Sequence, residues 1–138
     1  ATDAVIAALR TVGAKRVGMM SPLSVENSKS AVDYYTAMGF EIGAATALLV
    51  DHPVNAVNVP MERVIEAFEE VDGPDIDTLL HVGGSLGIVP LVQELEDKFG
   101  KPVLSVNAAT YWYALRKMGI NDPIPGFGKL LLETEIVE

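Results

Sequence analysis

Hydrophobic positions along the chain follow two spacings, one typical of helices and the other of buried strands. Val5, Ile6 and Leu9 repeat with the three-to-four-residue period of a helix face, and Val64 and Phe68 do the same further on. We therefore expect helices over Thr2–Val12, Ser24–Met38, Met61–Val71, from a glycine-rich turn to Phe99, and Ala108–Met118. Short apolar runs predict strands at Arg16–Met20, Phe40–Leu49, Ile76–Val82 and Lys101–Val106.

Each predicted strand is separated from the next by a predicted helix. Parallel strands need a crossover of a dozen or more residues, which is usually helical. The alternation therefore predicts an α/β fold, a four-stranded parallel sheet with helices on both faces. We expect residues 1–138 to form a single domain, with a helix in 1–13 and a C-terminal tail over 120–138. In such sheets ligands lie beyond the carboxyl ends of the strands, so the turns there are the places to search for a site.

Composition and charge exclude several classes of function. Ten basic residues stand against 19 acidic ones in a chain of 138, for a net charge of −9, and the basic residues are scattered. A nucleic-acid surface needs clustered Lys and Arg, so we expect no nucleic-acid partner. The mostly apolar segment 44–50, which contains one threonine, is far shorter than the roughly 20 residues of a membrane span, and no other apolar run approaches that length, so we expect no membrane partner. No basic leader precedes an apolar segment, and we expect a cytoplasmic location.

The sequence contains no cysteine and only two histidines. Disulfides, thiolate metal sites and cysteine catalysis within this chain are therefore excluded. The two histidines have no recognised zinc-ligand spacing, so we expect no metal site.

A glycine-rich turn, residues 83–87, follows the third predicted strand. Exposed backbone N–H groups, together with the positive end of the next helix, would suit a carboxylate. A tight turn that needs glycine only for its backbone angles explains the same residues. The turn lacks the Gly-x-Gly-x-x-Gly pattern and the P-loop lysine of nucleotide sites. We predict that Gly83, Gly84 and Ser85 bind a small carboxylate ligand.

Polar residues at the ends of neighbouring strands extend this candidate site. Ser21 follows the first strand and Asn107 the fourth, and both could orient a ligand, although Asn107 is also explained as a helix cap. His81 directly precedes the turn and is the candidate general base, because imidazole titrates near neutrality. Strand alternation turns it away from the face of residue 82. The alternative interpretation is therefore a structural histidine, either in the core with its hydrogen bonds satisfied or on the surface.

Three segments, 80–86, 92–103 and 105–116, resemble the second half of proteins of the aspartate/glutamate racemase superfamily. The closest branch is that of maleate cis–trans isomerase and arylmalonate decarboxylase. A Gly-Lys-Pro-Val strand followed by Asn-x-Ala-Thr-x-Trp is the most specific part, and residues 4–17 and 126–130 fit the branch as well. The resemblance implies one lobe of a two-lobed fold, with 1–13 as a possible inter-lobe helix. Ala8–Gly13 and Ala114–Gly119 share the pattern Ala-Leu-Arg-x-x-Gly, as a duplicated architecture would.

The resemblance also implies an isomerase, racemase or decarboxylase (a lyase) that acts on small carboxylates without a cofactor. In the family each lobe can contribute a cysteine, but the matching position here is Gly83 or Val82, and Ser21-Pro22-Leu23 replaces a Thr-Pro-Tyr turn. The chain is therefore a member or fragment of such an enzyme or, alternatively, a catalytically inactive carboxylate-binding or assembly module. Because a lone lobe should expose apolar surface, we expect a homo-oligomer or a missing sister lobe, in contact near 4–12 and 109–118.

Overall fold

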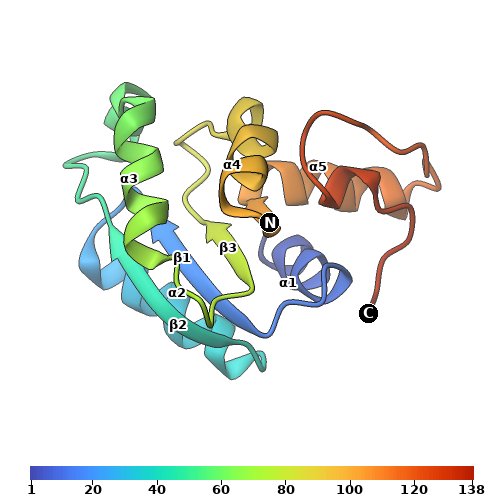
Figure 1. Cartoon of the computed structure of the whole chain (residues 1–138), viewed down its shortest axis with the longest axis horizontal. Coiled ribbons are helices and arrows are strands. Elements are labelled where there is room, and N and C mark those ends of the chain that lie inside the picture. Colours follow the sequence, from blue (N-terminus) through green and yellow to red (C-terminus); the bar gives the residue numbers. More distant parts are fainter.

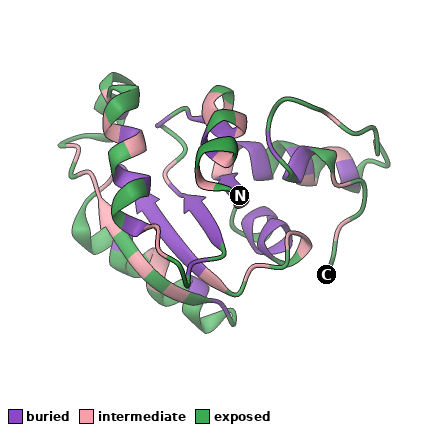
Figure 2. Cartoon of the chain, viewed as in Figure 1, coloured by how far each residue is buried: buried purple, intermediate pink, exposed green.

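Four short runs of mostly apolar residues form the sheet, in the computed structural model that describes residues 1–138. All neighbouring strands are parallel, and their order across the sheet is β2-β1-β3-β4, which confirms the predicted four-stranded parallel sheet. The strands are β1 (Arg16–Ser21), β2 (Glu41–Ala47), β3 (Thr78–His81) and β4 (Val103–Ser105). The central strands β1 and β3 are largely buried, whereas β2 is a half-exposed edge strand (Figure 2).

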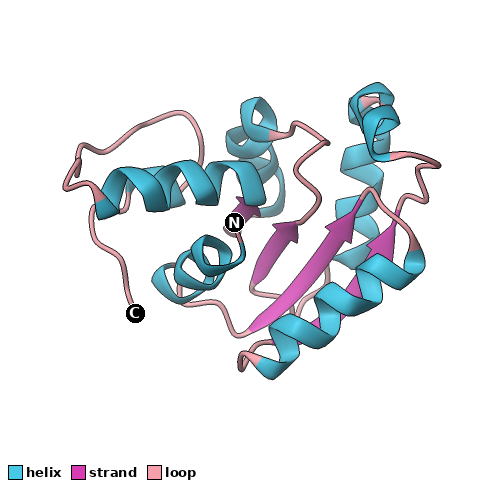
Figure 3. Cartoon of the chain, turned by 180° about the vertical axis from the view of Figure 1, so that it is seen from behind, coloured by secondary structure: helices cyan, strands magenta, loops and turns pink.

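Five α-helices connect and cover the strands, and Figures 1 and 3 show the sheet from its two sides. They are α1 (Thr2–Thr11), α2 (Val25–Ala37), α3 (Met61–Val71), α4 (Val92–Phe99) and α5 (Val106–Lys117), with 3₁₀ turns at Pro53–Asn58, Val89–Leu91 and Leu130–Leu132. The Ser24 side chain accepts a hydrogen bond from the Asn27 N–H and so caps α2. The N-cap residue of α1 is Ala1, which makes no side-chain cap bond.

Strand alternation divides the core into two hydrophobic clusters, one on each face of the sheet. Leu80 and Leu104 pack toward α1, α2 and α5, whereas their neighbours Leu79 and Val103 pack toward α3 and α4. The clusters hold 16 and 13 buried residues, so helices cover both faces, as the sequence predicts. His81 follows Leu80 by one residue, which by the same alternation places it on the α3/α4 side.

The helix at residues 1–13 is packed into this domain. Ala4–Leu9 are all buried, and α1 packs against α5. These six residues therefore present no exposed apolar surface, contrary to the expectation for residues 4–12. The oligomeric state itself stays a prediction.

The C-terminal tail lies along α5 and closes over α1. The Arg116 guanidinium donates to the carbonyls of Ile120, Leu131 and Glu133, at 2.7, 3.2 and 2.9 Å. Further on, the Val137 N–H donates to Thr11 Oγ1 at 3.0 Å. None of the helices is long and apolar enough to cross a membrane.

Candidate functional site

Turns that follow three neighbouring strands meet at the carboxyl edge of the sheet, near the tips of the β1 and β3 arrows (Figure 1). Pro22, after β1, lies so close to Gly83 that a Cβ built on that glycine would be 2.5 Å from the Pro22 Cδ. Asn107, after β4, donates from Nδ2 to the Gly84 carbonyl at 3.0 Å. The structure therefore brings together the segments that contain Ser21, the glycine turn and Asn107.

The turn leaves several backbone donors without a partner in the chain. The Gly83 carbonyl accepts from the Leu86 N–H at 3.2 Å, and Gly83 has a φ of +98°. The N–H groups of Gly83, Gly84 and Ser85 make no hydrogen bond within the chain. Because Gly84 and Ser85 are exposed, these donors are available to an anion.

Helix α5, and not α4, has its N-terminus at this edge of the sheet. A helix that begins at the glycine turn is a wrong prediction, because residues 83–88 form a loop and α4 begins only at Val92. The N-terminus of α5 lies beside the turn instead, since Asn107 in its first turn contacts Gly84. Its N-cap residue, Ser105, makes no side-chain cap bond, so the first N–H groups of α5 have no side-chain acceptor.

His81 is enclosed by the protein, with 0% of its surface exposed. Its Nε2 lies 3.0 Å from the Gly83 carbonyl oxygen, and its Nδ1 lies 3.3 Å from Ser105 Oγ. Burial lowers the pKa of His81 to about 4, against a smaller opposing effect of the Gly83 carbonyl, so the imidazole is neutral at neutral pH. A general base must reach its substrate, and this ring does not reach solvent, so that role stays a prediction.

The remaining predicted site residues differ in how far they are accessible. Ser21 is 2% exposed, and its Oγ accepts from the Leu23 N–H at 3.2 Å. Ser85 is exposed at the turn, whereas Asn107 is half-buried. The alternative interpretation of Asn107 as the cap of α5 is wrong, because Ser105 occupies the N-cap position and the Asn107 side chain bonds to Gly84.

The geometry of the turn distinguishes the two positions that match the family's cysteine. A side chain at Gly83 would collide with Pro22, at 2.5 and 2.7 Å from its ring carbons, and would have to adopt the left-handed φ of +98°. Val82, by contrast, already holds a side chain and is 9% exposed. Val82 is therefore the position of the two at which a cysteine would fit.

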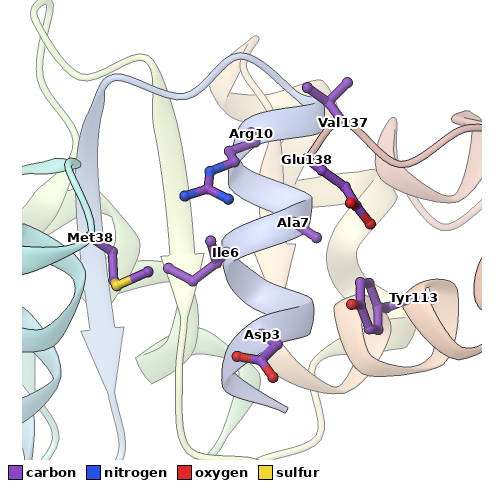
Figure 4. Close-up of a pocket in the computed structure, with 8 residues that line it drawn as sticks. All are labelled: Asp3, Ile6, Ala7, Arg10, Met38, Tyr113, Val137 and Glu138. Carbon is purple, nitrogen blue, oxygen red and sulfur yellow. The ribbon is translucent and has the colours of Figure 1, made fainter.

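A separate hollow of about 280 Å³ lies between α1, α5 and the tail (Figure 4). Its lining residues are Asp3, Ile6, Ala7, Arg10, Met38, Tyr113, Val137 and Glu138. None of them belongs to the carboxyl-edge turns, so this hollow is distinct from the candidate site. No group of three His, Asp or Glu side chains lies close enough together to hold a metal ion.

The parallel sheet and its helices define an α/β protein, a class of fold in which ligands lie beyond the carboxyl ends of the strands. The family model described as arylmalonate decarboxylase matches residues 1–131, and the chain belongs to this family. A maleate isomerase of Nocardia farcinica is 31% identical over 135 residues, which are 97% of this chain and 54% of that protein. A maleate isomerase of Geobacillus stearothermophilus is 26% identical over 129 residues, which are 93% and 51% of the two chains.

Solved structures of maleate isomerases share the fold. One is a cysteine-to-serine variant of the Nocardia farcinica maleate cis–trans isomerase with a covalently bound succinylcysteine intermediate. Its TM-score is 0.90 at 32% identity, and the match covers 94% of this chain and 53% of that one. Another is a cysteine-to-alanine variant of the Pseudomonas putida S16 maleate isomerase with maleate, with a TM-score of 0.90, 25% identity and coverage of 99% and 54%. The chain thus spans about half the length of the relatives that it matches.

Proposed function

We propose that this chain supplies a carboxylate-binding lobe of a cofactor-independent enzyme of the maleate isomerase and arylmalonate decarboxylase type. The observation that carries the proposal is the set of free N–H donors at Gly83, Gly84 and Ser85, at the edge where β1, β3 and α5 meet. Unpaired backbone donors beside a helix N-terminus attract a carboxylate. A structurally similar maleate isomerase was solved with maleate, which supports small dicarboxylates as the ligand class.

A cysteine-dependent reaction of the bound carboxylate requires a group that this chain lacks. In one relative the intermediate is bonded to a cysteine, whereas the 138 residues here contain none. A cysteine-dependent step would therefore need a residue from outside this sequence, on a sister lobe or another chain. The chain by itself should bind carboxylates and should not isomerise maleate, racemise aspartate or glutamate, or decarboxylate arylmalonates.

Titration of the ¹⁵N-labelled chain with maleate or malonate, at constant ionic strength, tests the binding site. We expect weak binding, with a Kd on the order of 1 mM, or about −4 kcal/mol. Amide shifts should concentrate at residues 83–86, 21–24 and 105–108. Gly84→Val should abolish them, because a Cβ there would lie 2.8 Å from Asn107 Oδ1. Glu69→Gln, on the exposed face of α3, is the control and should leave the shifts unchanged. Shifts spread over the basic side chains that disappear in modest salt would contradict the site.

Two measurements test the proposal that the lobe requires a partner. Proton NMR of maleate incubated with the chain should show no fumarate above the uncatalysed rate, and turnover by the chain alone would contradict the proposal. Light scattering at micromolar concentration should show a homo-oligomer if a second copy replaces the sister lobe. A compact monomer would exclude self-association and leave a separate lobe as the partner.

A further inference from the structure

The contacts of His81 determine which of its ring nitrogens carries the proton. A carbonyl oxygen only accepts hydrogen bonds, so Nε2, at 3.0 Å from the Gly83 oxygen, must be the donor. The neutral ring then has an acceptor at Nδ1, which lies 3.3 Å from Ser105 Oγ. Ser105 therefore donates to His81, and His81 donates to Gly83. This chain of two hydrogen bonds runs from the end of β4 to the glycine turn.

The same contacts determine where the free N–H donors point. In a trans peptide the carbonyl and the N–H of one unit point in opposite directions, and the chain has no cis peptide bond. The Gly83 carbonyl is directed to His81, so the Gly84 N–H, in the same peptide unit, is directed away from it. Likewise the Gly84 carbonyl is directed to Asn107, so the Ser85 N–H points away from that side chain.

A peptide between two glycines needs such support. Glycine adopts positive and negative φ with similar ease, so the Gly83–Gly84 unit could rotate at little cost in backbone strain. In the rotated state the Gly83 carbonyl oxygen would replace the Gly84 N–H and would repel a carboxylate. Rotation would also leave the buried His81 donor without an acceptor, which is costly because the ring is 0% exposed.

We propose that His81 is a positioning residue that, supported by Ser105, holds the Gly83–Gly84 peptide with the Gly84 N–H directed to the ligand. The imidazole acts through the backbone and transfers no proton to substrate. The Leu86 N–H, which also donates to the Gly83 carbonyl, holds the same orientation from within the turn. The benefit for ligand binding rests on the proposed carboxylate site, whereas the orientation of the peptide can be measured without a ligand.

The first test is the protonation state of the ring in the full 138-residue chain. Long-range ¹H–¹⁵N spectra at neutral pH should show His81 as a single neutral tautomer protonated at Nε2. A proton on Nδ1, or rapid averaging between the two tautomers, would overturn the proposal. The measurement needs no variant, so it decides the point even if substitutions at His81 prevent folding.

The second test compares two substitutions at His81. The Gln side chain can place an N–H donor near the position of Nε2, whereas Leu cannot. His81→Leu should shift the Gly84 and Ser85 amide resonances and weaken malonate binding about tenfold, the effect of losing one hydrogen bond to a charged group. His81→Gln should restore both. Unchanged Gly84 and Ser85 amides in His81→Leu, or a Gln variant that matches Leu, would overturn the proposal.

The two proposals fail in different ways. If the wild-type chain does not respond to malonate at Gly84 and Ser85, the proposed carboxylate site is wrong. The role of His81 is then decided by its tautomer and by the ligand-free amide shifts of the Leu variant.

Discussion

Burial of His81 should make the folding stability of this chain depend on pH in a defined range. The unfolded chain binds a proton at His81 with the ordinary pKa of 6.5, whereas burial lowers the pKa in the folded chain to about 4. Between these values the unfolded state binds more protons than the folded state, so stability falls as the pH falls. This contribution is present in full above pH 6.5 and is lost progressively as the pH approaches the folded-state pKa of about 4.

The size of the effect follows from the two pKa values. Each unit of difference corresponds to roughly 1.4 kcal/mol. From about pH 7.5 to about pH 4.5, the proton linkage of His81 should lower the free energy of unfolding by about 2–3 kcal/mol. His81→Gln has no group to titrate and can keep the donor to Gly83, so its stability should lack this part of the pH dependence.

Urea unfolding of the wild type and His81→Gln at both pH values measures the difference directly. Asp51, Glu70 and Glu138, whose pKa values are lowered by their hydrogen bonds, titrate in both proteins and cancel in the comparison. His52→Gln, in an exposed loop, controls for the replacement of an imidazole at the surface. If the stabilities of His81→Gln and the wild type change in parallel between the two pH values, the reasoning from burial is refuted.

Two further pairs of variants test the turn and the tail. Gly83→Ala should cost about 1–3 kcal/mol of stability, because its Cβ would meet Pro22 at a φ of +98°; Gly87→Ala, with nothing within 4 Å of its Cβ, is the control. Chemical denaturation compares them, and equal losses would contradict the close approach to Pro22. Arg116→Ala should cost about 2–4 kcal/mol, because it leaves three carbonyls without their donor. Hydrogen exchange should then accelerate over residues 120–133. Arg10→Ala is the control, because Arg10 occupies the equivalent position of the repeated Ala-Leu-Arg-x-x-Gly pattern but is exposed, and it should cost less than about 0.5 kcal/mol. Equal losses for the two variants would contradict the role of Arg116 in holding the tail.

Periodicity predicts most of the fold because the elements that it finds are amphipathic. Helix α3 has the expected bounds, Met61–Val71, since its buried face and the flanking Pro60 and Asp72 mark it clearly. Helix α4, by contrast, begins at Val92, several residues beyond the glycine turn from which the sequence predicts it. Leu86 and Ile88 are 3% and 0% exposed, so the loop after the glycines follows a non-helical path that fills the core beside α3 and α4. The local sequence does not predict this non-helical path, because it is determined by tertiary packing.

The sequence also predicts which turns meet but not how their side chains pair. The rule for carboxyl edges of parallel sheets is enough to bring Ser21, the glycine turn and Asn107 together. The contact between His81 and Ser105 depends on the register of β3 against β4, in which these two residues are partners. Strand alternation indicates that His81 lies on the opposite face of the sheet from residue 82. That Ser105, at the end of the neighbouring strand, is its hydrogen-bond partner can be inferred only when the register is known.

The contact between α1 and α5 has a consequence for the order in which the chain folds. Helix α1 is synthesised before the rest of this domain, yet α5, which covers it, comes about a hundred residues later, and the bond from Val137 to Thr11 joins residues 126 positions apart. Contacts between distant parts of a chain form late, because the long intervening loop must close first. During synthesis the apolar face of α1 should therefore stay uncovered until α5 has left the ribosome. A ribosome-bound chain that ends before residue 106 should bind a hydrophobic chaperone through this helix, and one that includes α5 should release it.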